Sequence, residues 1–126
     1  MKVVEKENKM TNICINGVEY VPATSKAEGR DGMPYQIVRT YSAGVFAGYV
    51  ESREGKEVTL RDAIRIWYWD GAASLSQLAV DGTCKPENCK FAVPVDKIMV
   101  TEAIEILDVT QKAKDSITSV KSWKAE

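Results

Sequence analysis

Residues 62–82 read DAIRIWYWDGAASLSQLAVDG, and the spacing of their apolar side chains changes part-way along. Apolar and other residues alternate over residues 62–69, which is typical of a β-strand. After Asp70-Gly71 the apolar residues recur at helical spacing over residues 72–81, and Gly82 is suited to end that helix. The stretch therefore predicts a strand that runs through a glycine turn into a helix.

Strand patterns continue towards the N-terminus. We predict strands over residues 35–41, 45–52 and 57–60, separated by short turns that contain glycine. The second of these strands contains Gly48, and a glycine inside a strand indicates a bulge or the close approach of another backbone. Further upstream, Asn16-Gly17 lies between two short apolar runs and predicts a hairpin, because both turn residues need positive φ angles.

The C-terminal third combines strand and helix patterns. Residues 91–95 are extended, and residues 97–107 fit either a helix or a strand, although their alternating apolar side chains favour a strand. Residues 110–120 are predicted as a helix with Thr110 as its N-cap. Together these elements predict an α+β fold, a small and mostly antiparallel twisted sheet of about five to seven short strands with two short helices. The edges of so small a sheet tend to pair with another chain, so we also expect an oligomer.

The chain is short enough for one hydrophobic core. It has 126 residues, a length at which a single domain is usual. Residues 1–11 are charged and carry little apolar pattern, so we assign them to an N-terminal arm and residues 12–126 to a single α+β ligand-binding domain. No apolar run approaches the ~20 residues of a membrane span, and no N-terminal stretch resembles a signal peptide.

The composition excludes several kinds of catalytic and metal site. The chain has no histidine, so it can form neither a Ser-His-Asp triad nor a zinc site that uses histidine. The 17 Lys and Arg nearly balance the 18 Asp and Glu, so net charge offers no general attraction to DNA or to an anionic membrane. Cys14, Cys84 and Cys89 are too sparse for a disulfide framework, and we expect reduced thiols. We therefore expect a binding protein without a metal or cofactor.

The junction between the predicted strand and helix carries the groups best suited to a nucleotide. Backbone N–H groups at a helix start attract phosphate, and Ser74 and Ser76 add hydroxyl groups there. On one strand face, Trp67 and Trp69 could stack on a flat base and Arg65 could pair with phosphate. Two alternatives stay open: the tryptophans could pack the core, and the aspartate of the Asp-Gly turn could cap the helix and repel an anion.

Three further residues could contribute to such a site. Asn88 and Phe91 combine an amide and an aromatic ring on a loop, a pair that can read a nucleobase. A turn role for Asn88 and a core position for Phe91 are the simpler interpretations. Arg39 lies within an apolar strand and needs an anionic partner, either a ligand or a sheet carboxylate such as Glu51 or Glu57.

Lys112 and Lys114 lie in the first turns of the predicted last helix. A lysine there opposes the helix dipole, so a nearby anion would stabilise it, although a solvated helix face is the simpler interpretation. Glu102 and Glu105 do not make a catalytic pair, because on a strand they would point to opposite faces. We find no nucleophile–base arrangement in the sequence and predict no catalytic residue.

Four runs of sequence together resemble a family of small phage and prophage proteins. They are VRTYSAGV at 38–45, SREGKEV at 52–58, RIWYWDGAASL at 65–75 and TEAIEIL at 101–107. The family includes the first-described type of Thoeris anti-defence protein, and the resemblance spans roughly residues 35–123. The second and fourth runs add to the more specific RTYSAGV and IWYWxGAxSL patterns.

The resemblance implies a sponge that binds cyclic ADP-ribose isomers, the glycosidically cyclised signals of bacterial TIR enzymes, and holds them intact in pockets between subunits. Some relatives also hold cyclic dinucleotides or trinucleotides at separate sites of a larger assembly. The implied protein is not an enzyme, acts in the cytoplasm of the infected host, and self-associates as a dimer or hexamer. It has no DNA or membrane partner. The residues that best match such a pocket are Trp67, Trp69, Ser74, Ser76, Asn88, Phe91, Lys112 and Lys114.

Two other classes of function stay open beside the sponge. One is an enzyme that degrades the same signals, which would need acid–base groups other than histidine. The other is a phage structural or interaction module that binds protein and no nucleotide.

Overall fold

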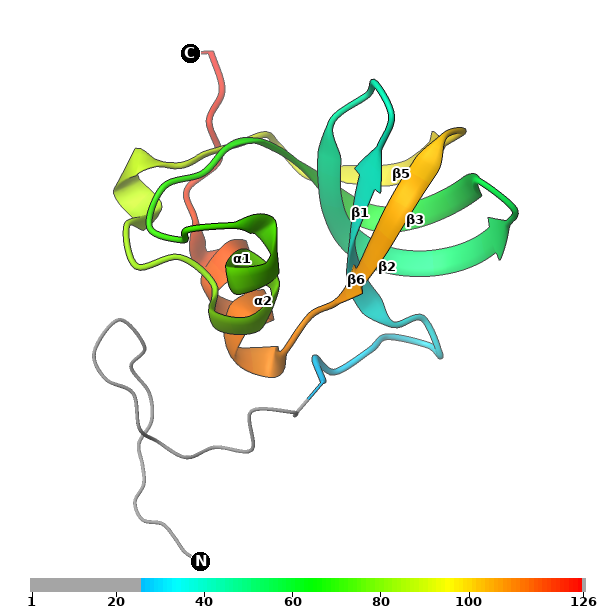
Figure 1. The fold of residues 1–126 in the computed structure, drawn as a ribbon, viewed down its shortest axis with the longest axis horizontal. Coiled ribbons are helices and arrows are strands. Elements are labelled where there is room, and N and C mark those ends of the chain that lie inside the picture. Colours follow the sequence, from blue (N-terminus) through cyan, green and yellow to red (C-terminus); the bar gives the residue numbers. More distant parts are fainter. Residues whose placement is uncertain (1–25, 126) are drawn as a thin grey trace, which may run out of the picture.

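The computed structural model describes residues 26–125 and has the predicted α+β fold (Figure 1). One six-stranded sheet carries two helices, and every strand pair in it is antiparallel. The strands are β1 (Tyr35–Thr40), β2 (Val45–Glu54), β3 (Glu57–Tyr68), β4 (Lys90–Phe91), β5 (Val95–Val100) and β6 (Ala103–Asp108). The helices are α1 (Leu75–Asp81) and α2 (Gln111–Ser119), with a short 3₁₀ helix, η2, over Pro86–Asn88.

The sheet curls so that its two outer strands approach each other. The strand order is β4-β3-β2-β1-β6, and β5 pairs with β3 beside β4. Only Thr101 and Glu102 separate β5 from β6, and three backbone steps span at most about 11 Å. The start of β6 is held by two hydrogen bonds, from the Tyr41 N–H to the Glu102 carbonyl and from the Ala103 N–H to the Lys56 carbonyl, both 2.9 Å. The sheet therefore encloses part of its own hydrophobic core.

The third and fourth predicted strands, 57–60 and 62–69, are one strand, so their separation was wrong. Asp62 has a φ of 49°, and β3 has one extra residue where Gly48 lies opposite it on β2. A Cβ on Gly48 would lie 3.0 Å from the Arg61 carbonyl oxygen and 3.1 Å from the Ala63 Cα. The prediction of a close backbone approach at this glycine is confirmed, and the cause is a β-bulge.

The bulge also changes which face of β3 each residue joins. Before it, Val58 and Leu60 belong to one buried cluster, and after it, Ile64 and Ile66 belong to another. The first cluster fills the inside of the curled sheet and contains Val38, Phe46, Val58, Leu60, Ala63 and Val100. The second lies between the other face of the sheet and the helices and contains Ile37, Ala47, Ile64, Ile66, Leu78, Phe91, Ala113 and Ile117, among others.

The two helices lie beside each other against one side of the sheet (Figure 1). Thr110 is the N-cap of α2, as predicted, and its Oγ1 accepts from the Ala113 N–H at 3.0 Å. Gly82 ends α1 with a φ of 76°, a backbone angle that favours glycine. The predicted helix starting at residue 72 is shorter than expected, because Ser74 is the N-cap of α1.

The strand prediction for residues 97–107 is confirmed except at Thr101 and Glu102, but a single strand was wrong, because these residues belong to two strands that pair at different edges of the sheet. The break at Thr101 and Glu102 allows β5 to pair with β3 and β6 to pair with β1. The predicted arm over residues 1–11 and the hairpin at Asn16-Gly17 lie outside the described residues.

Candidate functional site

The strand–helix junction uses its own side chains to satisfy its backbone donors. Ser74 caps α1, and its Oγ accepts from the Gln77 N–H at 3.1 Å. The Gln77 Oε1 accepts in turn from the Ala73 N–H at 2.6 Å. This reciprocal arrangement occupies N–H groups that a phosphate would need, and α1 has only seven residues. Ser76 is exposed beside this cap. The hydrogen bonds of the junction therefore serve chiefly to begin the helix and not to bind a ligand.

Asp70 ties two loops together, and the alternative in which it caps α1 is wrong. Its Oδ1 accepts from the Gly71 N–H at 2.9 Å and its Oδ2 accepts from the Asn88 side-chain amide at 3.0 Å. The Asn88 bond first, and the Gly71 bond second, hold the pKa of Asp70 below its ordinary value. The Asn88 side-chain amide therefore stabilises the loop, as we expected if Asn88 has a turn role.

The two tryptophans of the predicted strand face have different surroundings. Trp69 follows the end of β3, is partly buried against the core, and donates its Nε1–H to the Ala72 carbonyl at 3.2 Å. Trp67 is 63% exposed. The ring of Phe91 is in the core and only 1% exposed, so it offers no face to a ligand. Core packing thus accounts for Trp69 and Phe91, whereas Trp67 is left at the surface.

Trp67 is one member of a surface cluster that also contains Lys90 and Trp123, here called the tryptophan–lysine cluster. The ring centroids of Trp67 and Trp123 are 5.7 Å apart with their planes at 59°. The Lys90 Nζ lies 6.0 Å from the Trp67 ring centroid and 5.2 Å from that of Trp123. Trp123 is 47% exposed. Two aromatic faces beside an ammonium group can hold a flat ring that carries negative charge.

Backbone pairing far along the chain positions the members of this cluster. Lys90 lies on β4 opposite Tyr68, at the end of β3. The Trp123 N–H donates to the Phe91 carbonyl at 2.9 Å, which holds the C-terminal segment beside β4. Sequence reasoning missed Lys90 and Trp123. Part of the signal was present, because the neighbour of a buried strand residue such as Phe91 points away from the core.

The two candidate arginines are each engaged locally. Arg39 donates from Nε to the Glu105 Oε1 at 2.8 Å, and not to Glu51 or Glu57, because β1 pairs with β6 in a register that places Arg39 opposite Glu105. The Arg65 guanidinium lies over the Phe46 ring, 4.8 Å from its centroid. Both arginines therefore cover or brace the sheet.

The two candidate lysines of α2 lie in separate contacts. The Lys112 Nζ is 3.6 Å from the Asp81 Oδ1 and links α2 to α1. The Lys114 Nζ donates to the Glu28 carbonyl at 3.0 Å and lies 4.8 Å from the centroid of the Tyr49 ring. The structure thus gives each predicted basic residue its own neighbours and does not gather all of the predicted residues into one site.

A family model matches residues 33–117, which is more than half of the chain. The chain belongs to the family described as "Domain of unknown function (DUF6948)". No curated protein and no solved structure matches the chain. The DUF6948 match contains Trp67 and Lys90 and ends before Trp123, so the tryptophan–lysine cluster joins residues inside the matched region to one beyond it.

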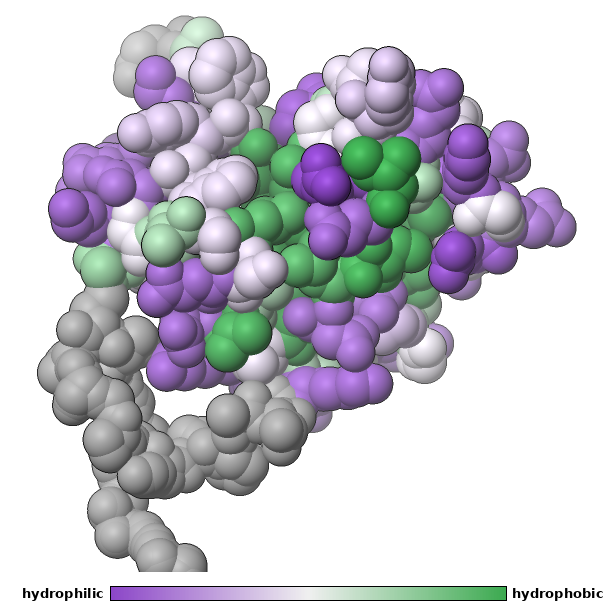
Figure 2. Space-filling model, viewed as in Figure 1, coloured by the Kyte–Doolittle hydropathy of each residue, from purple (hydrophilic) through white to green (hydrophobic). Residues whose placement is uncertain are grey.

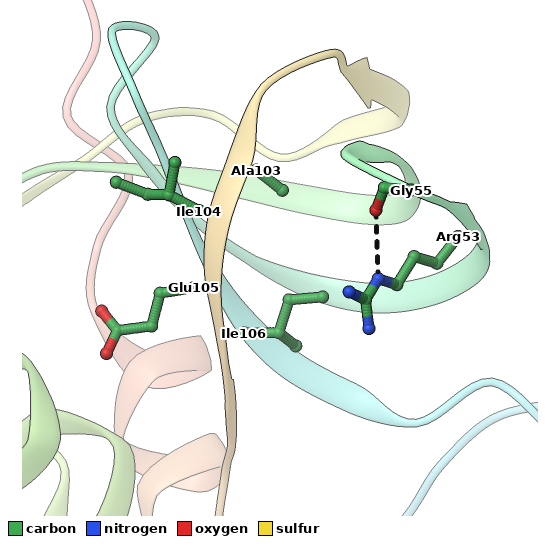
Figure 3. A pocket seen from close by; sticks show the side chains of 6 residues that line it. All are labelled: Arg53, Gly55, Ala103, Ile104, Glu105 and Ile106. Carbon is green, nitrogen blue, oxygen red and sulfur yellow. Dashed lines mark hydrogen bonds between the residues drawn. The ribbon is translucent and has the colours of Figure 1, made fainter.

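A hollow of about 210 Å³ opens within the DUF6948 region, between β6 and the turn that joins β2 to β3. It is lined by Arg53, Gly55 and residues 103–106. The Arg53 Nε donates to the Gly55 carbonyl at 3.2 Å, and Figure 3 shows the guanidinium facing Ile106 across the hollow. The hollow shares no residue with the tryptophan–lysine cluster. The charged residues among those that line it are Arg53 and Glu105.

Residues 26–125 of the DUF6948 chain contain two free thiols and two short α-helices, and no cluster of metal ligands. No group of three or more His, Cys, Asp or Glu in this part could hold a metal ion. Cys84 is exposed and Cys89 is buried, and both are unpaired thiols. Neither α1 nor α2, the helices of the described part, is long and apolar enough to cross a membrane.

Proposed function

We propose that this chain is a phage anti-defence sponge. It binds and sequesters TIR-derived cyclic ADP-ribose isomers (glycocyclic ADP-ribose) without cleaving them, and it thereby blocks Thoeris immune signalling in the cytoplasm of the infected host. The proposal begins from the resemblance of residues 38–45 and 65–75 to the phage family. The observation that carries it further is the tryptophan–lysine cluster.

The chemistry of that cluster suits such a ligand. A cyclic ADP-ribose has a flat adenine and a pyrophosphate with two negative charges. The half-exposed faces of Trp67 and Trp123 can stack on the base, and the Lys90 ammonium, within about 6 Å of both ring centroids, can pair with phosphate. Because the net charge of the chain is −1, phosphate recognition has to come from such local groups and not from a basic surface.

Sequestration fits the chain better than turnover. Without histidine, cleavage of a glycosidic or phosphate bond would need a carboxylate, lysine, cysteine or tyrosine with a shifted pKa as acid or base. Among the described residues, the Asn88 hydrogen bond holds the pKa of the Asp70 carboxyl below its ordinary value and keeps it ionised, and burial raises the pKa of the Tyr35 hydroxyl and keeps it protonated. We extend the proposal to cyclic dinucleotides and trinucleotides, held at sites separate from the tryptophan–lysine cluster.

A recovery experiment tests the proposal directly. The full chain is incubated with cyclic ADP-ribose made by a TIR enzyme, the free ligand is measured after filtration, and the protein is then denatured to release what it holds. We expect depletion of free ligand and recovery of the intact molecule by mass spectrometry. Unchanged free ligand at protein excess would overturn the proposal. A cleavage product that grows with time would replace the sponge with the enzyme.

Two variants test the role of the cluster in that experiment. Trp67→Ala removes one stacking face, and base–aromatic stacking contributes about 1–3 kcal/mol, so affinity should fall about tenfold or more. Tyr41→Ala is the matched control, because Tyr41 is a 76% exposed aromatic residue outside the cluster. Equal affinities for both variants would exclude the cluster as the binding site while leaving sequestration itself to the recovery experiment.

A thermal-shift panel addresses the structural-module alternative. A ligand that binds only the folded state raises the unfolding temperature. We expect a rise with cyclic ADP-ribose isomers, and a flat response across all cyclic nucleotides would favour a protein that binds no nucleotide.

A further inference from the structure

The curled sheet leaves a gap along the seam where β6 approaches the turn between β2 and β3. At the start of this seam, the Ala103 N–H donates to the Lys56 carbonyl at 2.9 Å. Beyond that bond, no strand of the described part pairs with this edge of β6, and the hollow of about 210 Å³ lies in the gap. The mouths of barrel-like sheets are common places for small ligands. The hollow therefore lies where such folds commonly bind small molecules.

Arg53, on the wall of this hollow, differs from the other arginines of the chain in having no side-chain partner among residues 26–125. Each of the others is held by a carboxylate or an aromatic ring: Arg30 by Asp62, Arg39 by Glu105, Arg61 by Glu51 and Asp96, and Arg65 by Phe46. Arg53 donates only from Nε, to the Gly55 carbonyl at 3.2 Å. Its two terminal nitrogens are left as a planar fork of donors, which matches the two oxygens of a carboxylate.

The acidic residues near the hollow leave this guanidinium unpaired. Glu105 accepts from the Arg39 Nε at 2.8 Å, and Figure 3 shows its side chain directed away from Arg53. Glu54 and Glu57 face each other at the turn between β2 and β3, and neither forms an ion pair with Arg53 in the described part of the chain. Their negative charges repel an anion in proportion to its charge. A singly charged ligand is therefore favoured over a dianion such as phosphate.

An apolar wall lies opposite the guanidinium. Figure 3 shows Ala103 and Ile106 on the side of β6 that faces Arg53, and Ile104 and Glu105 on its other side. Ala103 and Ile106 are partly buried and pack against the hydrophobic cluster inside the curled sheet. Figure 2 shows hydrophobic surface on the face of the molecule where β6 lies in front. A ligand in the hollow would thus meet a cation on one side and aliphatic side chains on the other.

We propose that this hollow, here called the seam site (Arg53, Gly55, Ala103 and Ile106), binds a small monocarboxylate that carries an aliphatic group. The two terminal nitrogens of Arg53 pair with the carboxylate oxygens, and the aliphatic group packs on Ala103 and Ile106. The volume of about 210 Å³ is below the ~300–1,000 Å³ of pockets for drug-sized ligands, so the ligand is a short-chain acid and not a nucleotide. The seam site shares no residue with the tryptophan–lysine cluster, and binding there is independent of the proposed sequestration.

A titration of the full chain with isovalerate, a branched short-chain monocarboxylate, tests the seam site. Two-dimensional proton–nitrogen NMR follows the backbone amides at millimolar probe concentrations, because so small a ligand binds weakly. We expect the largest saturable shifts at Gly55 and residues 103–106. Isovaleramide has the same shape without the charge, so it should bind about tenfold more weakly or worse. The proposal is overturned if isovalerate causes no saturable shift at these amides, if it shifts only the tryptophan–lysine cluster, or if the amide binds equally well.

A charge variant and a matched control locate the carboxylate. Arg53→Met keeps an aliphatic stem but removes the guanidinium, so the dissociation constant for isovalerate should rise about tenfold or more. Lys97→Met removes the same charge from an exposed position of β5 and should leave that constant unchanged. Both residues are exposed, so both variants should fold, which circular dichroism checks. Equal dissociation constants for Arg53→Met and the wild type would show that Arg53 does not bind the carboxylate and would overturn the proposal.

A second pair of variants tests the apolar wall without changing any charge. Ile106→Val removes one methylene from the side of β6 that faces Arg53, so the dissociation constant should rise about threefold. Ile104→Val removes the same group from the other side of β6 and should leave binding unchanged. A loss in Ile104→Val as large as that in Ile106→Val would place the ligand outside the seam site and overturn the proposal.

Discussion

The strand–helix junction and the tryptophan–lysine cluster both begin at the end of β3, yet they use their polar and aromatic groups in opposite ways. At the junction, Ser74, Gln77 and Asp70 accept hydrogen bonds from nearby donors of the same loops. In the cluster, Trp67 and Trp123 keep about half of their surface exposed. The junction has more residues of the types that are common in phosphate-binding sites. The cluster has more of its aromatic and charged groups exposed and able to contact a ligand.

The difference shows why a donor-rich motif is weak evidence for a phosphate site. The start of a helix leaves several backbone N–H groups without partners inside the helix. Side chains of nearby residues often accept hydrogen bonds from these groups, and a bound anion would need the same donors. Side chains that satisfy the helix are then unavailable for an anion. The following changes separate structural groups at the junction from binding groups in the cluster.

The largest effect is expected at Gly71 in the junction. This residue has a φ of 85°, and a Cβ there would lie 2.5 Å from the Thr83 Oγ1 and 2.6 Å from the Lys85 nitrogen. Gly71→Ala should lower the free energy of unfolding by about 3 kcal/mol, measured by urea denaturation. Gly32→Ala is the control, because Gly32 has a φ of 81° but open space around it. Equal losses in both variants would show that the contacts of Gly71 do not matter.

The next effect separates the two tryptophans. Trp69 packs partly against the core, so Trp69→Ala should lower the free energy of unfolding by about 2 kcal/mol. Trp67→Ala should change it by less than about 1 kcal/mol, because a largely exposed side chain loses little buried area. Chemical denaturation of both variants measures this. A larger loss for Trp67→Ala than for Trp69→Ala would mean that the cluster is mainly structural.

The helix cap should have a smaller effect. Ser74→Ala removes the acceptor for the Gln77 N–H, and loss of an N-cap typically costs about 1 kcal/mol. Ser76→Ala, two residues further along the chain and exposed, should change stability by less than about 0.5 kcal/mol. The same two variants should bind ligand as the wild type does. Weaker binding by Ser74→Ala without a matching loss of stability would return the phosphate role to the junction.

The smallest effect concerns pH and Asp70. Its pKa is lowered in the folded state, so between the folded and the ordinary value, about 3.9, the unfolded chain binds more protons. Its contribution to stability is therefore complete above the ordinary pKa and is lost as the pH falls through the lowered one. The unfolding temperature of Asp70→Asn should approach that of the wild type as the pH falls below about 4. A gap that widens at acid pH would contradict this.

A control for the pH effect comes from its main cause. Asn88→Ala removes the hydrogen bond that contributes most to lowering the pKa of Asp70. In the Asn88→Ala background, the pH-dependent effect of Asp70→Asn on the unfolding temperature should therefore be smaller. An unchanged difference would assign the effect to the Gly71 N–H or to other groups.

Local features of the fold could be predicted where one residue type has one strong reason to be present. Thr110 and Gly82 were expected to cap their helices and do so. The Thr110 side-chain oxygen accepts from a backbone N–H of the first turn of α2, and Gly82 adopts the positive φ at which α1 ends. Gly48 was expected to allow a close approach and does. The same local logic failed at Asp62, where a bulge joins two predicted strands into one, because the chain can adopt that φ only with support from β2.

The candidate site was harder to predict because its members are remote in sequence. Trp67 was a candidate from the start, but Lys90 and Trp123 join it only through the pairing of β3 with β4 and the bond from Trp123 to Phe91. Arg39 pairs with a sheet carboxylate, as one of the two expectations had it, but not with Glu51 or Glu57, for the same reason. Glu105 lies opposite it because β6 returns to pair with β1, and strand order is not encoded in local spacing.

The amino-acid sequence by itself determined the class of the fold, the caps of its helices and the absence of histidine chemistry, because each depends on residue type or on neighbours within one turn. Tertiary structure alone decided that the sheet curls, that Trp69 and Phe91 pack inward while Trp67 stays exposed, and that one edge of β6 has no strand partner among residues 26–125. Those outcomes depend on which strands pair, and pairing is chosen by the burial of whole faces, which no single segment can specify.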